Sequence, residues 1–295
     1  MLENILMVTL LCSACEQQEQ AYQRWLDYTT VASGTVDGKL AGSWGDPSLE
    51  GQAFFIMQPA SEETAYLRFI SSPRPVDYRP MSRLGWDAAE LLVEDPDALA
   101  DKLADGEDFR ALQGPAYLTE QRNIRAFQAA GPDNELLYFT RIIDTTLTSL
   151  DFGQAATPVD RVFIAVLGTS NLETSRRFYR QALETSSSPP VPYRVGLLSE
   201  AHGLPLETRH ALSLMPLAGR SLIEMDQFPE TATPLPMKGL PAGGIAMLTF
   251  TATTLPDTLK PFAPALGVTT FPYAGRQTAT FEGPDGERLE LVLQP

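Results

Sequence analysis

The sequence predicts an α+β fold built from four similar units, each made of a strand, a helix and several further strands. The first observation behind this prediction is a repeated hairpin pattern. An apolar-alternating strand, a Gly-Pro-Asp turn and a second strand occupy residues 123–142 and again 278–293. Gly131 and Gly283 of these turns lie 152 residues apart, about half of the 295-residue chain. Such a spacing indicates a duplicated chain.

The second observation is a helix that follows the first strand of each half. Residues 16–28 and 171–183 have helical patterns, and each carries a tyrosine on its apolar stripe, Tyr22 and Tyr179. The two tyrosines are 157 residues apart, which agrees with the hairpin repeat. A polar, threonine-rich stretch at residues 144–158 separates the two halves and is expected to be a linker.

The first strand of the chain is expected at residues 5–15, which are mostly apolar. A signal peptide is the alternative, but Glu3 is the only charged residue before this stretch, where a secretory segment is positive. The stretch contains Cys12-x-x-Cys15, a spacing found in redox and zinc sites. Zinc would need two further ligands that are not nearby. We therefore expect two partly buried thiols, with a redox motif as the alternative.

Each half divides again into two units. Residues 88–103 have the pattern of a strand followed by a helix that starts at Asp-Pro, and residues 245–266 have a strand followed by a proline-initiated helix. Further strands are expected in both halves, at residues 54–58, 64–70, 210–217 and 220–226. A sheet of so few strands leaves an apolar face and an open edge, so the units are expected to pair.

Composition limits the partners of the protein. The chain has 22 Lys and Arg against 37 Asp and Glu, a net charge of −15, which disfavours nucleic acid and anionic membranes. It contains no apolar run of about 18 residues, so no membrane span is expected. With 43% hydrophobic residues it can form a sizeable core. We expect a cytoplasmic monomer or homodimer that acts on a small molecule.

Residues 162–183 and 282–292 together resemble the vicinal oxygen chelate superfamily, which includes glyoxalase I, extradiol dioxygenases, epimerases and bleomycin-resistance proteins. The resemblance implies tandem βαβββ modules paired into two cup-shaped, mostly antiparallel eight-stranded domains. Modules 1 and 2 would form the domain of residues 1–145, and modules 3 and 4 that of residues 159–295. This fold supports many chemistries, so it does not specify the reaction.

The resemblance also implies where a metal would bind. Family ligands are usually a His on the first strand and a Glu on the last strand of a module. The last-strand positions of modules 3 and 4 are Glu224 and Glu290. In the first half these positions fall on Arg68 and Tyr138, which cannot hold a divalent cation because Arg stays protonated.

The first-strand positions carry no standard ligand: they fall on Ile164 or Arg161 in module 3, and near Gly244 or Met247 in module 4. The two histidines, His202 and His210, are not on first strands. Because a site of two histidines and one carboxylate is therefore missing, we expect no metal cofactor. A rearranged site from Glu224, Glu290 and one histidine is the alternative.

We expect Glu224 and Glu290 to share one apolar cleft, where like charges raise a carboxyl pKa and provide an acid and a base near neutral pH. His210 is a third catalytic candidate, with a hydrogen-bonded strand residue as the alternative. The candidate substrate-binding residues are Arg161, Phe163, Tyr193, Phe250, Tyr273, Arg68 and Tyr138, and Phe271 and Arg276 are further candidates. For each of them a role in the core or on the surface is the alternative.

Three functions remain open from the sequence. The first is a metal-independent lyase or isomerase that uses paired carboxylates on an apolar or aromatic substrate. The second is a ligand-sequestering protein of the bleomycin-resistance type. The third is a metal-dependent dioxygenase or glyoxalase-like enzyme with altered ligands.

Overall fold

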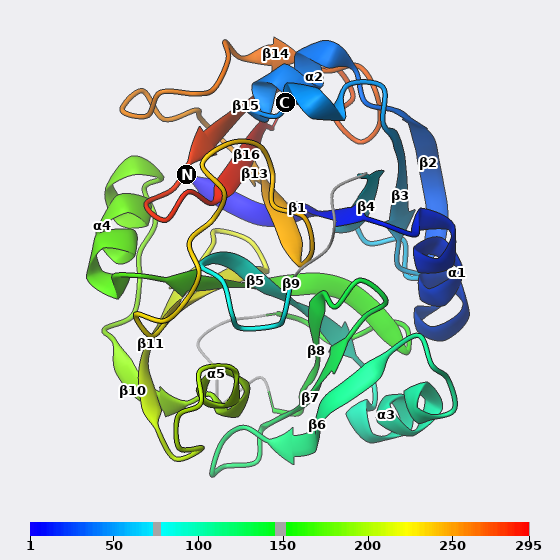
Figure 1. Cartoon of the computed structure of the whole chain (residues 1–295), viewed down its shortest axis with the longest axis vertical. Coiled ribbons are helices and arrows are strands. Elements are labelled where there is room, and N and C mark those ends of the chain that lie inside the picture. Colours follow the sequence, from blue (N-terminus) through cyan, green and yellow to red (C-terminus); the bar gives the residue numbers. More distant parts are fainter. Residues whose placement is uncertain (73–77, 145–151, 295) are drawn as a thin grey trace.

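The computed structural model describes residues 1–72, 78–144 and 152–294, which form two curled eight-stranded sheets (Figure 1). The first sheet has the order β14-β15-β16-β13-β1-β4-β3-β2 and the second the order β10-β11-β12-β9-β5-β8-β7-β6. Most neighbouring strands are antiparallel, and the predicted α+β fold of βαβββ modules in two cup-shaped sheets is confirmed.

The strands of the first sheet are β1 (Leu2–Cys12), β2 (Thr29–Thr35), β3 (Ala53–Gln58), β4 (Tyr66–Ser71), β13 (Ile245–Ala252), β14 (Leu266–Gly267), β15 (Gln277–Glu282) and β16 (Arg288–Leu293). Those of the second sheet are β5 (Gly85–Val93), β6 (Arg110–Tyr117), β7 (Ile124–Ala130), β8 (Leu136–Ile142), β9 (Val159–Thr169), β10 (Val191–Arg194), β11 (Arg209–Pro216) and β12 (Leu222–Gln227). The helices are α1 (Cys15–Leu26), α2 (Gly38–Ser43), α3 (Pro96–Ala104), α4 (Leu172–Ala182) and α5 (Gly196–Ala201), with a 3₁₀ turn at Pro47–Leu49.

The modules pair differently from the expected arrangement. Strand β1 of module 1 pairs with β13 of module 4, and β5 of module 2 pairs with β9 of module 3. The two sheets therefore do not correspond to the expected domains of residues 1–145 and 159–295. Modules 1 and 4 share one sheet and modules 2 and 3 share the other, so the expected pairing of modules 1 with 2 and 3 with 4 is wrong. All four first strands are strongly apolar, so their local pattern does not specify which one pairs with which.

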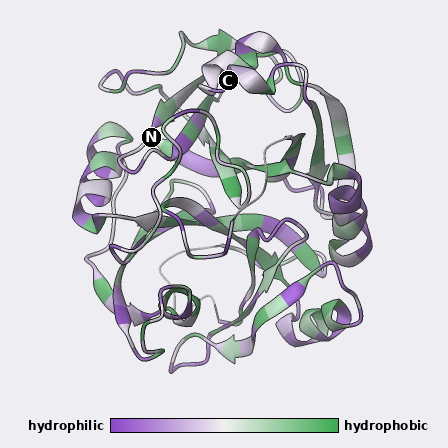
Figure 2. Cartoon of the chain, in the orientation of Figure 1, coloured by the Kyte–Doolittle hydropathy of each residue, from purple (hydrophilic) through white to green (hydrophobic). Residues whose placement is uncertain are grey.

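Apolar side chains fill three regions. The largest lies between the sheets and under the helices α1, α3 and α4, which contribute one apolar stripe each. A second fills the concave side of the first sheet, the first cup, where α2 packs. A third fills the concave side of the second sheet, the second cup, where α5 packs. Figure 2 shows hydrophobic residues along the strands and a largely hydrophilic α1.

The duplication is repeated in atomic detail at the two hairpins. Glu135 accepts hydrogen bonds from the Tyr22 hydroxyl at 2.8 Å and from the amide of Asp133 at 3.0 Å. In the second half, Glu287 accepts them from Tyr179 at 3.0 Å and from the amide of Asp285 at 2.9 Å. These contacts join the helix of one module to the hairpin of the next.

A glycine is required at the start of each hairpin turn. A Cβ atom at Gly131 would lie 1.9 Å from the carboxylate of Glu135, and one at Gly283 would lie 1.9 Å from that of Glu287. The Gly-Pro-Asp repeat of the sequence therefore has a packing cause.

The helix expected after the strand of module 4 does not form. Residues 253–265 are irregular, and β13 is followed directly by this loop and the short β14. Pro256, Pro261 and Pro264 lie in this stretch, and proline has no N–H for helical hydrogen bonding.

The two cysteines form a disulfide, so the expected pair of thiols is wrong. Cys12 ends β1 and Cys15 begins α1, and the turn between them holds their Cα atoms 5.2 Å apart, which suits a disulfide. In the described part of the chain, no helix combines the length and the apolar character needed to cross a membrane.

Candidate functional site

The first cup contains a cavity of about 310 Å³. Its walls come from β2, β3, β4, helix α2 and the loop before β15. Most of the surface is apolar or aromatic, and the lining residues are Ala32, Ser33, Gly34, Thr35, Asp37, Leu40, Trp44, Phe54, Ile56, Arg68, Thr270, Phe271 and Tyr273. A concave apolar cavity with a few polar groups is typical of a small-molecule site.

Arg68 on β4 provides the positive charge of this cavity. The Nη1 group donates to the Tyr273 hydroxyl at 2.7 Å, while Nε and Nη2 donate to Oγ1 of Thr9 at 3.1 and 2.9 Å. The guanidinium lies over the Trp44 ring, 4.3 Å from its centroid. Arg68 is only 2% exposed, and these contacts hold its guanidinium in one orientation.

Glu290 on β16 neutralises Arg68 from below the cavity. Its fully buried carboxylate accepts hydrogen bonds from Nε1 of Trp44 at 2.8 Å, Oγ1 of Thr249 at 2.8 Å and the Tyr273 hydroxyl at 2.9 Å. Oε2 lies 3.9 Å from Nη2 of Arg68. Glu290 is not a lining residue, whereas Trp44, Arg68 and Tyr273 are, so the carboxylate contacts the cavity wall without lining the cavity.

The hydroxyl of Tyr273 joins the two charges, since it accepts from Arg68 and donates to Glu290. Burial raises the pKa of Tyr273, with the Arg68 charge opposing and the Glu290 charge adding to the rise. The phenol therefore keeps its proton at physiological pH and acts as a hydrogen-bond donor.

The second cup holds carboxyl groups that take part in none of the ion pairs between described residues. Burial, followed by the charge of Glu224, raises the pKa of Glu90 to about 8, while the hydroxyl of Thr140, which donates to Glu90 at 3.0 Å, lowers it. Burial also raises the pKa of Glu224 to about 7. Asp226 is fully buried, and neither of its carboxyl oxygens has a hydrogen-bond partner among the described residues. Burial, then Glu224, raises its pKa well above the usual range.

Two further predicted residues lie beside these carboxyls. Tyr138 on β8 pairs in register with Glu90, and Tyr193 on β10 pairs with His210 on β11. The Tyr193 hydroxyl donates to the carbonyl of Leu118 at 2.7 Å. His210 is buried, and its Nε2 lies 3.0 Å from Oγ of Ser199. Burial lowers the pKa of His210, which favours the neutral imidazole, so the alternative of a hydrogen-bonded strand residue describes it better than a catalytic role.

The structure separates Glu224 from Glu290, so the expected shared cleft is wrong. Glu290 belongs to the first sheet and Glu224 to the second. Because modules 1 and 4 pair, the last-strand partner of Glu290 is Arg68, and because modules 2 and 3 pair, that of Glu224 is Tyr138.

Three of the predicted lining residues also lie elsewhere. Phe250 packs in the core between the sheets, with its ring 5.9 Å from that of Trp86. Phe163 is fully buried against Phe152 in the core of the second cup. Arg161 lies on the seam between the sheets. Each is on an apolar strand buried on both faces, where alternation does not reveal which side faces a cavity.

Four residues of the two cups were not predicted from the sequence: Trp44, Thr9, Thr249 and Glu90. A partial signal existed for three of them, because Thr9, Thr249 and Glu90 are among the few polar residues of largely apolar first strands. Buried polar groups need partners, so such positions mark the inner face of a cup. Trp44 had no such signal, since it follows the short helix α2 that folds into the cup.

The residues of the two cups do not fit the metal site that the family implies. In the first cup a guanidinium stands beside the one glutamate, and the hydroxyls of Thr9 and Thr249 are engaged with those two side chains. Over residues 1–72, 78–144 and 152–294, no three His, Cys, Asp or Glu side chains are grouped closely enough to hold a metal ion. The rearranged site of Glu224, Glu290 and a histidine is therefore wrong, because these glutamates lie in different sheets.

Sequence comparison finds no matching family model and no matching curated protein. Solved structures are similar in fold. Glyoxalase I from Zea mays superposes with a TM-score of 0.65 at 14% identity, covering 98% of this chain and 92% of that one. A putative dioxygenase from Bacillus subtilis superposes with a TM-score of 0.62 at 11% identity, covering 100% and 86%. The cppA protein from Streptococcus pneumoniae reaches 0.50 at 12% identity, covering 99% and 98%.

Two curled sheets of paired βαβββ modules, one of them enclosing a cavity, form a fold similar to that of the Zea mays glyoxalase I and of the Bacillus subtilis protein. This is the four-module arrangement that the resemblance to the vicinal oxygen chelate superfamily implied. At these identities the likeness concerns the fold alone.

Proposed function

We propose that the first cup is the substrate site of a metal-independent lyase or isomerase. Its substrate is a small, flat, largely apolar molecule, such as an aromatic carbonyl compound. One observation carries the proposal: Arg68 presents fixed N–H donors to a largely apolar cavity, beside the hydroxyl of Tyr273. Fixed donors in a water-poor cavity stabilise negative charge that develops on a substrate oxygen.

The donors of Arg68 are sufficient for this role. A guanidinium has five N–H groups, and Arg68 uses three of them on Tyr273 and Thr9. Two N–H groups remain for an oxygen of the substrate. The Glu290 carboxylate compensates the guanidinium charge, which lowers the cost of burying it.

The proton step runs through Tyr273. As a C–H bond next to the carbonyl breaks, its proton moves to the Tyr273 oxygen, and the phenolic proton moves to Oε2 of Glu290, 2.9 Å away. The electron pair forms an enolate whose oxygen faces Arg68. Return of a proton to carbon completes an isomerisation, and cleavage of a neighbouring bond completes a lyase reaction. Because Tyr273 stays protonated, Glu290 is the final base.

The second candidate is ligand sequestration without turnover, as in bleomycin-resistance proteins. It is favoured by the position of Glu290, whose carboxylate accepts three hydrogen bonds and does not line the cavity.

The test measures binding and proton exchange separately. Calorimetry compares benzoate with neutral benzamide. NMR in D₂O, with chelator present, follows exchange of the α-protons of a panel of arylacetaldehydes, aryl alkyl ketones and 3-aryl-2-oxo acids. We expect benzoate to bind more tightly, and Tyr273→Phe to abolish exchange while it retains benzoate binding. Tyr193→Phe, in the second cup, is the matched control.

Binding without exchange by the native protein would support sequestration and contradict the enzyme. If neither benzoate nor any compound of the panel binds or exchanges, both candidates are contradicted.

A further inference from the structure

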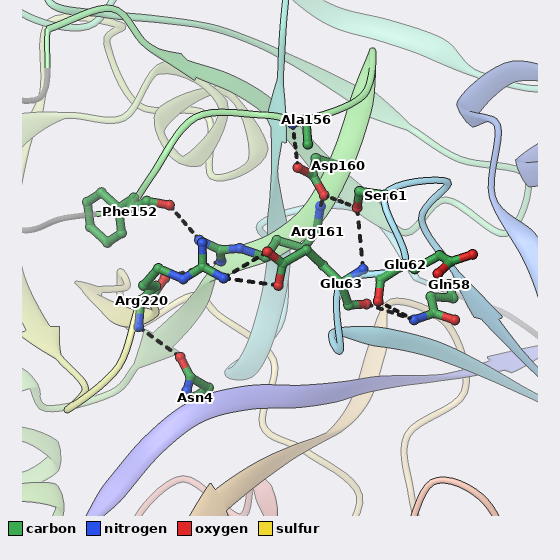
Figure 3. A network of polar contacts seen from close by, with 10 residues as sticks. All are labelled: Asn4, Gln58, Ser61, Glu62, Glu63, Phe152, Ala156, Asp160, Arg161 and Arg220. Carbon is green, nitrogen blue, oxygen red and sulfur yellow. Dashed lines mark hydrogen bonds and ion pairs between the residues drawn. The ribbon is translucent and has the colours of Figure 1, made fainter.

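A second cavity, of about 280 Å³, lies on the seam between the two sheets. It is bounded by β1, the residues before β4, the start of β9 and the turn between β11 and β12 (Figure 3). The lining residues are Asn4, Ile5, Glu63, Thr64, Ala65, Arg161, Val162, Gly219, Arg220 and Ser221. None of them lines the cavity of the first cup.

Arg161 carries a buried charge that is paired with no carboxylate among the described residues. The residue is 5% exposed, and its guanidinium donates to two neutral acceptors, the carbonyl of Arg220 at 3.2 Å and that of Phe152 at 2.5 Å. Among the described ion pairs of the chain, none includes Arg161. A buried guanidinium without an anion is costly.

The neighbouring Asp160 does not supply that anion. Its carboxylate accepts from the Ser61 hydroxyl, from the backbone N–H of Ala156 at 2.7 Å and from the backbone N–H of Arg161 at 2.8 Å (Figure 3). The guanidinium of Arg161 instead extends toward the seam, beside a second arginine.

Arg220 is that second cation. Its Nη2 donates to both carboxylate oxygens of Glu63, at 2.8 and 3.0 Å, and its backbone N–H donates to Oδ1 of Asn4 at 2.8 Å. Burial, followed by the charge of Arg220, lowers the pKa of Arg161, while the charges of Glu63 and then of the neighbouring Asp160 raise it. The cavity is therefore lined by two guanidinium groups and one carboxylate, a local positive excess in a chain with a net charge of −15.

We propose that this seam cavity binds a small oxyanion, a carboxylate or a phosphate, between Arg161 and Arg220. Arginine is suited to both because its planar donors match two oxygens of either group. The amide of Asn4 and the hydroxyl of Thr64 line the same cavity and add neutral donors. The site lies outside both cups, so it does not depend on the function proposed for the first cup.

Such an anion would link the two sheets. Asn4 belongs to β1 of the first sheet, whereas Arg161 belongs to β9 and Arg220 precedes β12 of the second. Binding to the folded state alone raises the unfolding temperature in a saturable way.

The test titrates the native protein with inorganic phosphate and, separately, with succinate, at constant ionic strength. Calorimetry measures affinity and the unfolding temperature reports coupling to the seam. We expect saturable binding of at least one anion, weakened about tenfold or more by Arg220→Gln, because a charge-assisted hydrogen bond is lost. Arg220 is half exposed, so this variant is expected to fold.

Glu63→Gln gives the opposite expectation. Removal of the one lining carboxylate raises the local positive potential, so the anion should bind several-fold more tightly. Arg177→Gln is the matched control, since Arg177 is an exposed arginine on α4 that lines a different cavity. The affinity of the Arg177→Gln variant for the anion should equal that of the native protein.

Saturation by phosphate alone or by succinate alone supports the site and identifies its ligand. The proposal is overturned if neither anion saturates. It is also overturned if Arg220→Gln binds as tightly as Arg177→Gln, because stabilisation would then be general screening of charge.

Discussion

The two cups place different charges at equivalent positions of the same topology. In the first sheet, Nη2 of Arg68 on β4 lies 3.9 Å from Oε2 of Glu290 on β16. Both side chains form a hydrogen bond with the hydroxyl of Tyr273. On the last strands of the second sheet, the partner of Glu224 is Tyr138, and no ion pair among the described residues includes Glu224 or the neighbouring Glu90 and Asp226. A buried carboxylate thus has two solutions, either an ion pair held by hydrogen bonds or retention of a proton.

The difference determines what each cup can do. The Arg68–Glu290 ion pair of the first cup lies beside a largely apolar cavity. The second cup holds protons that it releases as the pH rises through the range of its raised pKa values. We infer that the first cup is suited to recognise an oxyanion, and that the second makes stability depend on pH.

Arg68→Met should have the largest effect, since it leaves Glu290 buried beside no cation. Removal of one member of a buried pair costs about 3 to 5 kcal/mol, and urea unfolding at pH 7 measures it. The double variant Arg68→Met with Glu290→Gln should recover much of the loss. If the double variant is no more stable than the single one, the two charges are not coupled.

Glu224→Gln should act in the opposite direction and stabilise the protein above pH 7. The folded-state pKa values of Glu90, about 8, and Glu224, about 7, lie above their ordinary value of 4.5. The folded protein then binds more protons than the unfolded chain between these limits, so stability falls as pH rises from about 4.5 to about 8 and then levels off. The slope is of order 1 kcal/mol per pH unit for each such group.

The variant should flatten this slope, which unfolding at several pH values measures. Burial also raises the pKa of Asp87, Glu135 and Glu287. These carboxyl groups contribute to the pH dependence of stability in the same direction, and their contribution remains in the variant. An unchanged slope in Glu224→Gln would show that its carboxyl does not hold a proton.

Trp44→Phe should have an intermediate effect confined to the first cup. It removes the indole N–H that donates to Glu290 at 2.8 Å, at a cost of about 1 to 3 kcal/mol. It should also weaken benzoate binding, because the indole lines the cavity and supports Arg68. Trp25→Phe, which loses a hydrogen bond to Asp108 outside both cups, is the control for stability and should bind benzoate normally.

His210→Phe should have the smallest effect, within about 1 kcal/mol in unfolding free energy. Burial lowers the pKa of His210, so the imidazole it replaces is neutral, and its one hydrogen bond is to Ser199. Proton exchange in the first cup should not change. A large loss of exchange would return His210 to the catalytic residues.

Much of the fold was predictable, because repeats and periodicity are local properties of the sequence. The hairpins at Gly131 and Gly283, the helices with Tyr22 and Tyr179, and the last-strand positions of Glu224 and Glu290 are all confirmed as elements of the structure. The prediction of a helix after β13 was wrong, because the prolines that suggest a helix start also prevent a helix from continuing.

The candidate site was predictable only in its parts. Glu290, Arg68 and Tyr273 were each named from the sequence, but Glu290 was assigned to the wrong partner. Assigning the right partner requires knowing that β1 pairs with β13, and edge pairing between four similar apolar strands depends on the whole chain.

The sequence alone determined the four modules, the strand that carries each last-strand residue and the acidic surface charge, since these follow from local pattern and composition. Only the tertiary structure decided which modules share a sheet, and thereby that Glu290 meets Arg68 while Glu224 meets Glu90. The physical reason is that pairing energies come from contacts between residues far apart in the chain, which no local pattern encodes.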